Sequence, residues 1–215
     1  TQNSSGSGQP FDAAYEQLSG EGLIVYTNQD KTDKRVHYRN VVNGIIGAEQ
    51  HGSTLGNYGT MYNLVPNPSS DEIILMTIDN DKDTRILVWD GSVWSDKGEV
   101  STNTQSATYM SIAGAYETNS GRALIVYSNN SNTPMYRIWD GALTPQFRAA
   151  TGQEIPRWTK MASNPNSDEL LLIYNTRLNN IDAQYWNTTN WTRISLSTTN
   201  TNSARNGIGV AYENS

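Results

Sequence analysis

The sequence contains no cysteine, which excludes disulfide bonds, thiol catalysis and thiolate metal sites. It also lacks any long apolar run, so no segment is predicted to span a bilayer. No segment shows a sustained apolar period of about 3.6 residues, and little helix is therefore expected. The formal net charge is −6, and an acidic surface disfavours nucleic acid and anionic membranes as partners. The polar, lysine-poor composition favours an extracellular or cell-surface protein.

Two phrases recur along the chain in alternation. The first runs through Ala14–Glu16, a Ser-Gly pair and an apolar strand, and it returns from Ala115. Its opening appears a third time at Val210–Glu213. The second phrase, Asn-Pro-x-Ser-Asp-Glu before an apolar run, begins at Asn67 and again at Asn164. Self-similarity at a fixed spacing indicates a repeat architecture.

Each repeat unit has the same predicted order of four short strands. A strand rich in small residues comes first, then a near-continuous apolar strand, an alternating strand that ends in an aromatic residue, and a looser fourth strand. A continuous apolar strand is buried on both faces, and four strands in about 40 to 50 residues are typical of a propeller blade.

We therefore predict an all-β, four-bladed β-propeller with blades of about 48 residues. A two-sheet sandwich would explain the short strands but not their recurrence unit by unit. The predicted segments are a flexible stretch over 1–10, blades over 11–58, 59–108, 109–157 and 158–206, and an extra inner strand over 207–215.

The alternation of the two phrases, with the Trp-Asp-Gly-x-x-Trp ending at Trp89–Trp94, resembles tandem β-propeller-type repeats of secreted bacterial and archaeal proteins of unassigned role. This resemblance covers residues 11 to 215 and implies the fold rather than a function. The Trp-Asp-Gly element and the unit length are also similar to lectin propellers of the tectonin kind. The sugar-binding residues of those lectins cannot be matched one by one in this sequence.

The C-terminal segment duplicates the inner strand of the first unit. Four blades need only one such strand, so two segments compete for one place. Three outcomes stay open: the chain is part of a longer protein with more blades, the C-terminal strand closes the ring, or one copy pairs with a neighbouring molecule. Head-to-tail donation of this last kind can build filaments. The predicted assembly strand is Ile208, Gly209, Val210, Ala211, Tyr212 and Glu213.

Tryptophan is the residue type that most suggests a ligand, because sugars stack on exposed indoles. Trp89, Trp139 and Trp186 end equivalent third strands, where packing between blades alone demands a large ring. Trp94 and Trp191 follow in the next turn and are the better candidates. The predicted glycan-binding set is Trp94, Trp191, Trp89 and Trp186.

A loop in the second unit places three carboxylates at alternate positions, namely Asp79, Asp81 and Asp83. Calcium takes oxygen ligands from loops of this kind. Thr84 stands where a glycine usually follows, and Lys82 lies among the acids, so a solvated turn is the competing interpretation. No cofactor is expected apart from a calcium ion in this loop.

The remaining polar motifs do not converge on a catalytic site. Glu16, Glu117 and Glu213 recur with the repeat, and a catalytic group is usually needed once, so turn and edge roles are predicted. The two histidines, His37 and His51, stand in no metal-ligand or nucleophile spacing. Four glycosylation sequons begin at Asn3, Asn129, Asn187 and Asn190, and they matter only if the chain passes through a glycosylating pathway.

The sequence thus favours a non-catalytic, extracellular structural or adhesive repeat module that self-assembles head-to-tail by strand donation. Its expected partners are like modules and glycans. The alternatives are a carbohydrate-binding lectin propeller that uses the repeated tryptophan turns, and a fragment of a larger surface protein with more blades.

Overall fold

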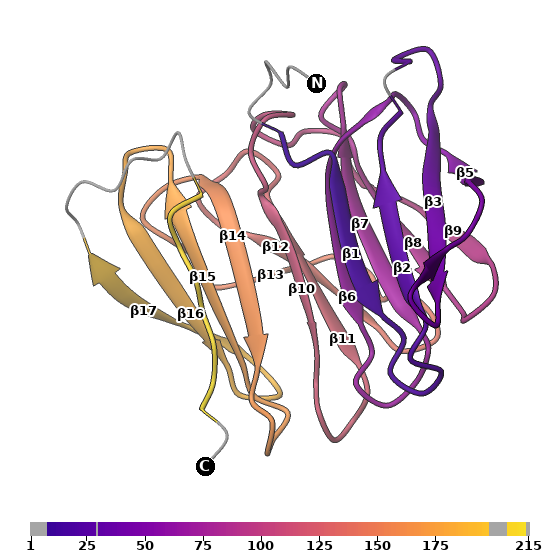
Figure 1. The fold of residues 1–215 in the computed structure, drawn as a ribbon. Coiled ribbons are helices and arrows are strands. Elements are labelled where there is room, and N and C mark those ends of the chain that lie inside the picture. Colours follow the sequence, from indigo (N-terminus) through magenta and orange to yellow (C-terminus); the bar gives the residue numbers. More distant parts are fainter. Residues whose placement is uncertain (1–7, 29, 198–205, 214–215) are drawn as a thin grey trace. The chain divides into compact units, whose positions relative to one another are not determined.

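The structure is a computed structural model that describes residues 8–28, 30–197 and 206–213. In this part of the chain all regular elements are β-strands, as predicted (Figure 1). None of its elements is a helix long and apolar enough to cross a bilayer. The chain divides into two compact units, which we describe separately: the first spans residues 1–102 and 106–110, and the second spans 103–105 and 111–215.

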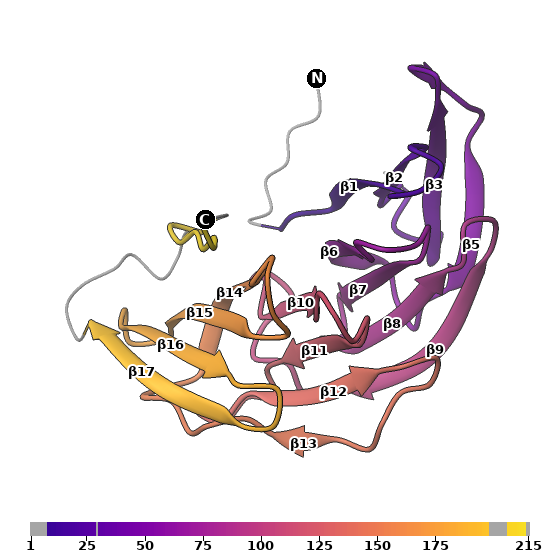
Figure 2. The same cartoon turned by 90° about the horizontal axis from the view of Figure 1, so that it is seen from below.

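The first unit contains two antiparallel sheets, and these two sheets lie next to each other (Figure 2). The first sheet consists of β1 (Phe11–Tyr15), β2 (Gly22–Tyr26), β3 (Arg35–Val42), β4 (Ile45–Ile46) and β5 (Gln50–Thr54). Within it, β4 and β5 both pair with β3. The second sheet consists of β6 (Gly59–Pro66), β7 (Ile73–Asp79), β8 (Thr84–Trp89) and β9 (Trp94–Ser101).

The second unit repeats this arrangement with two four-stranded sheets. The third sheet consists of β10 (Ile112–Tyr116), β11 (Ala123–Tyr127), β12 (Met135–Trp139) and β13 (Phe147–Arg148). The fourth sheet consists of β14 (Pro156–Ser163), β15 (Leu170–Thr176), β16 (Ile181–Trp186) and β17 (Trp191–Ser197). Each sheet falls within one predicted blade, except that β14 begins at Pro156 rather than at or after position 158.

Most residues in the second strand of each sheet are buried, as the continuous apolar sequence predicts. All residues of β7 and β11 are buried, so these strands are covered on both faces. In each unit a hydrophobic cluster joins the two sheets. Leu23, Val25 and Tyr38 of the first sheet meet Leu75 and Trp89 of the second. In the second unit Leu124, Val126 and Tyr136 meet Leu172 and Trp186.

The Ser-Gly turns of the first phrase have the same geometry in both units. Gly20 and Gly121 each have a φ of 72°, a left-handed conformation that glycine adopts without steric cost. The turns are further held by the sheet next to them. Asp71 Oδ1 accepts the backbone N–H groups of Leu18 and Ser19 at 2.8 and 2.9 Å. Asp168 Oδ1 does the same for the equivalent turn of the second unit.

The predicted assembly strand forms no strand in this structure. Residues 206–213 carry no regular secondary structure, although residues 211–213 repeat the Ala-Tyr-Glu sequence found at the ends of β1 and β10. Burial, and after it the Glu169 carboxylate, raises the pKa of the Tyr212 hydroxyl. Pairing of this segment with another chain stays a prediction, and the flexible stretch predicted over 1–10 lies mostly outside the described residues.

Candidate functional site

The tryptophans that end the third strands are core residues. Trp89 and Trp186 are 1% and 2% exposed, and neither has a ring face open to a sugar. The Trp89 indole N–H donates to Glu16 at 2.5 Å, and that of Trp186 donates to Glu117 at 2.7 Å. Packing between two sheets therefore explains both rings, and they leave the predicted glycan-binding set.

Trp94 and Trp191 complete a matching aromatic cluster in each unit. Trp94 packs on Trp89 with ring centroids 5.4 Å apart, and Trp191 packs on Trp186 at the same distance. Trp191 is 9% exposed, while Trp94 is partly exposed. Their indole N–H groups are buried without a hydrogen-bond partner. Their role in glycan binding stays a prediction.

The acidic loop uses Asp79 to hold its own backbone. Asp79 is 3% exposed, and its Oδ1 accepts the N–H groups of Asp81 and Asp83 at 2.9 and 3.1 Å. Its Oδ2 accepts the N–H of Asn57 at 2.8 Å. Burial, and after it Asp79, raises the pKa of Asp83. These contacts are those of a closed turn, and calcium binding there stays a prediction.

Three of the four sequon asparagines lie among the described residues, and their glycosylation stays a prediction. Asn187 and Asn190 lie exposed in the β16–β17 turn, and Asn129 is partly buried in the loop after β11. Asn3 lies outside the described residues.

A row of side chains on one face of the first sheet forms a site that the predicted residues did not include. Register pairs Phe11 with Tyr26, Tyr26 with His37, and His37 with His51, across β1, β2, β3 and β5. Directly opposite residues of an antiparallel sheet point to the same face. The rings of Tyr26 and His37 lie 6.0 Å apart, and those of His37 and His51 lie 4.7 Å apart. Phe11 is 62% exposed, whereas His37 is 1% exposed.

The Tyr26 hydroxyl is the centre of a polar network on this face. It donates to Glu49 Oε2 at 2.5 Å and accepts from Arg39 Nε at 3.2 Å. Arg39 also donates to the Gly47 carbonyl at 2.8 Å. Burial, and after it the bond to Glu49, raises the pKa of Tyr26, while the Tyr26 and then the His37 contact lower the pKa of Glu49. The network therefore presents a neutral phenol between a carboxylate and a guanidinium.

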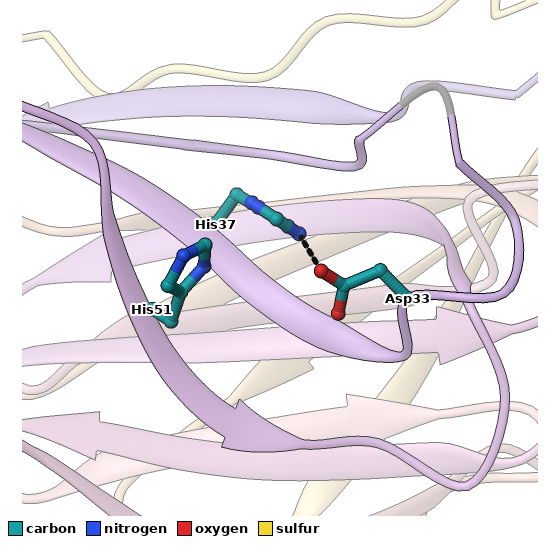
Figure 3. A group of neighbouring side chains, drawn as sticks. All are labelled: Asp33, His37 and His51. Atoms are coloured by element: carbon teal, nitrogen blue, oxygen red, sulfur yellow. Dashed lines mark ion pairs between the residues drawn. The ribbon is translucent and has the colours of Figure 1, made fainter.

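A second group, Asp33 with His37 and His51, lies beside this network (Figure 3). One ligand atom from each residue lies within 4.8 Å of the other two. His37 Nδ1 is 3.2 Å from Glu49 Oε1, and His37 Nε2 is 3.2 Å from Asp33 Oδ2. Glu49 thus contacts both groups. We call Asp33, His37 and His51 the histidine cluster, and Tyr26, Arg39 and Glu49 the arginine cluster.

The second unit has a counterpart of the arginine cluster, formed by Tyr127, Arg137 and Gln146, but no counterpart of the histidine cluster at the described positions. At the same register, Tyr127 donates to Gln146 Oε1 at 2.9 Å, and Arg137 donates to the Thr144 carbonyl at 2.9 Å. Met135 and Arg148 pair where His37 and His51 pair in the first unit. The aromatic row is absent there as well, since Ile112 is paired with Tyr127.

The sequence spacing of the two histidines does not indicate a metal site, yet the structure brings both close to Asp33. Their separation in sequence matches no short motif, because β3 and β5 are joined through the short strand β4 before they pair. One sequence feature points to their proximity: the strand that contains His37 is followed after a short connection by the strand that contains His51. Without the register, that signal does not say which residues face each other.

No family profile and no curated protein matches the sequence. Solved structures do match its fold. An arginine-substituted variant of AofleA from Arthrobotrys oligospora has a TM-score of 0.63 at 10% identity, over 88% of this chain and 57% of that one. The Aleuria aurantia lectin, described as a six-bladed β-propeller with a novel fucose recognition mode, has a TM-score of 0.58 at 13% identity, over 92% and 64%. The GH93 α-L-arabinofuranosidase of Fusarium graminearum has a TM-score of 0.54 at 10% identity, over 87% and 66%.

These similarities show a fold of the β-propeller type. They include the Aleuria lectin and give no support to the predicted relationship with bacterial and archaeal repeat proteins. The chain spans less than two thirds of the length of AofleA and of the Aleuria lectin. Its four sheets thus match part of a six-bladed structure. A propeller complete with four blades is therefore not what this comparison supports.

Proposed function

We propose that this chain is a carbohydrate-binding module of the propeller type, and that sugar binds on the face of the first sheet around Tyr26. The observation that carries this proposal is the combination of an exposed ring and a polar network in one place. Phe11 is 62% exposed and directly opposite Tyr26, whose hydroxyl bonds Arg39 and Glu49. The lectins among the similar folds support it.

The chemistry of this face suits a pyranose ring. The apolar face of a sugar packs on an exposed aromatic ring, here Phe11. Its hydroxyl groups both donate and accept, so they can donate to the Glu49 carboxylate and accept from the Arg39 guanidinium. The side chains of Arg39 and Glu49 are 38% and 36% exposed, which leaves both within reach of a ligand. A small number of placed polar groups beside aromatic surface is the usual composition of such sites.

We propose binding without catalysis. Glycosidic bond cleavage usually needs two carboxyl groups on opposite sides of the bond, one of which must be protonated. On this face the Tyr26 contact lowers the pKa of Glu49, and the Arg35 guanidinium lowers the pKa of Asp33, so both carboxyls are ionised near neutral pH. A surface glycan is also the ligand that the predicted extracellular, adhesive role would use.

A glycan array followed by titration calorimetry tests the proposal. α-L-Fucosides are the first probes, because the Aleuria lectin is described by its fucose recognition. We expect Phe11→Ala and Arg39→Met each to weaken binding at least tenfold. Arg137→Met is the matched control, because Arg137 holds the equivalent position in the second unit without an exposed aromatic residue beside it.

Two results would contradict this assignment. Absence of binding to every glycan on the array would remove the function itself. Loss of binding in Trp94→Ala or Trp191→Ala, with Phe11→Ala unchanged, would move the site to the tryptophan turns.

A further inference from the structure

We propose that Asp33, His37 and His51 bind a divalent transition-metal ion of the zinc class. This inference is independent of the sugar site, although the two share Glu49. It starts from the buried ring of His37. That ring is 1% exposed, and its Nε2 is buried without a hydrogen-bond partner. A buried nitrogen of this kind costs free energy unless something binds it.

The Glu49 carboxylate fixes the tautomer of His37. Glu49 is ionised, and a carboxylate in that state only accepts hydrogen bonds. His37 Nδ1, 3.2 Å from Glu49 Oε1, therefore carries the proton. In the neutral ring with its proton on Nδ1, Nε2 carries a lone pair that faces Asp33 Oδ2 at 3.2 Å. That distance is short enough for an ion pair, yet the direction makes no hydrogen bond. A metal ion that is also held by His51 would bind both lone pairs.

The spacing fits a metal with bonds of about 2.0–2.2 Å to nitrogen and oxygen, for which neighbouring ligands in a tetrahedron stand about 3.3 Å apart. His37 Nε2 and Asp33 Oδ2 are already 3.2 Å apart. The three ligand atoms lie within 4.8 Å of one another, so His51 has to approach by at most about 1.5 Å, on the order of what a side-chain rotation gives. His51 is exposed and can rotate, whereas His37 is held on both sides.

Arg35 competes for Asp33 but does not block it. Its Nε donates to Asp33 Oδ1 at 3.0 Å and its Nη2 donates to Oδ2 at 2.8 Å. These are the contacts of a carboxylate, the form of Asp33 that a metal requires. Two carboxylate oxygens offer about four lone-pair sites in total. Oδ2 can therefore accept from Arg35 and still face the metal.

The ligand set selects the metal class. Two imidazoles and one carboxylate suit zinc and its first-row neighbours, whereas calcium and magnesium prefer oxygen alone. Three protein ligands leave a further position for water or an exogenous group. Glu49 then acts as the outer partner of a metal-bound histidine, which orients the ring and raises its basicity.

The second unit supplies the test variants. Met135 and Arg148 stand at the positions of His37 and His51, and Met135 is buried in the same register. The chain has only two histidines, so any imidazole ligation in untagged protein reports on this cluster. We expect one Zn²⁺ bound per chain by titration calorimetry, visible absorption bands with Co²⁺ as a probe, and a higher melting temperature with Zn²⁺.

Replacement by the residues of the second unit, His37→Met and His51→Arg, should each weaken Zn²⁺ binding at least tenfold. His51 is exposed, so His51→Arg keeps the test valid if His37→Met fails to fold. Excess Ca²⁺ should not displace the bound ion. The proposal is overturned if the native chain shows no saturable Zn²⁺ binding, if His51→Arg binds as the native chain does, or if Ca²⁺ competes. Sugar binding has its own readout, so either proposal can fail alone.

Discussion

Glu16 of the first sheet accepts a hydrogen bond from the indole of Trp89 in the second sheet at 2.5 Å, with the carboxylate 4% exposed and the ring 1% exposed. Glu117 and Trp186 repeat this contact at 2.7 Å in the second unit. The Glu16 and Glu117 side chains also accept from the hydroxyls of Ser19 and Ser120, within the Ser-Gly turns. In each unit, the glutamate that follows the first strand of one sheet therefore binds the tryptophan that ends the third strand of the other sheet.

We predict that Trp89→Phe lowers the free energy of unfolding by about 2–4 kcal/mol, because it removes the indole donor from one oxygen of a buried carboxylate and also removes packed volume. Trp186→Phe should have an effect of the same size. Glu16→Gln keeps an acceptor and should cost less. Urea unfolding followed by tryptophan fluorescence measures these differences. A loss below about 0.5 kcal/mol in both tryptophan variants would show that the bond contributes little.

The contact from Asp71 to the turn of the first sheet gives a second stability prediction. Asp71→Ala removes an acceptor from the N–H groups of Leu18 and Ser19, and should cost about 1 kcal/mol. Asp168→Ala is the equivalent change in the second unit. Because the two sites share no partner, the double variant should lose about the sum of the two. Asp71→Asn retains one oxygen acceptor, and equal losses in Asn and Ala variants would contradict the hydrogen-bond explanation.

The buried hydroxyl of Tyr62 should make the free energy of unfolding fall at high pH. Burial raises its pKa to about 12, and its side chain is 0% exposed. An unfolded tyrosine ionises at about pH 10, so between pH 10 and 12 the unfolded state binds fewer protons than the folded state. Stability should therefore fall by about 2–3 kcal/mol over that range. Tyr62→Phe should remove this part of the fall, and an unchanged pH profile in that variant would assign the loss to other groups.

The sequence predicts the strands better than the site, for a physical reason. Apolar runs such as Ile73–Ile78 and the Ser-Gly turns are local patterns that direct burial and chain reversal by themselves, and the strands β7 and β11 lie where these patterns place them. Trp89 ends a third strand, and its ring is buried, as packing between blades requires. The site depends on register. Phe11, Tyr26, His37 and His51 come from four strands, and a shift of one residue in any pairing would separate them.

The number of blades could not be predicted either. The sequence of each repeat determines its own sheet and the contact with the adjacent sheet, as the Glu16–Trp89 bond illustrates. It does not determine how many sheets the complete propeller contains. Repeat architectures are stabilised by such nearest-neighbour terms. The segment at 208–213 shares its Ala-Tyr-Glu sequence with the end of the β1 repeat and nevertheless has no strand structure.

Glu49 offers a way to separate the two proposed ligands, because one oxygen bonds Tyr26 and the other contacts His37. Gln146 holds the equivalent place in the second unit and still accepts from Tyr127 at 2.9 Å. Glu49→Gln should therefore preserve the arginine cluster while it removes the charge that supports His37. We expect Zn²⁺ affinity to fall about tenfold, as for other partners of metal-bound histidines, with sugar affinity changed less. Titration calorimetry with each ligand measures both. A variant that loses the sugar and keeps Zn²⁺ would show that the Glu49 charge serves sugar binding alone, and that His37 is oriented by the packing of β3 rather than by its carboxylate neighbour.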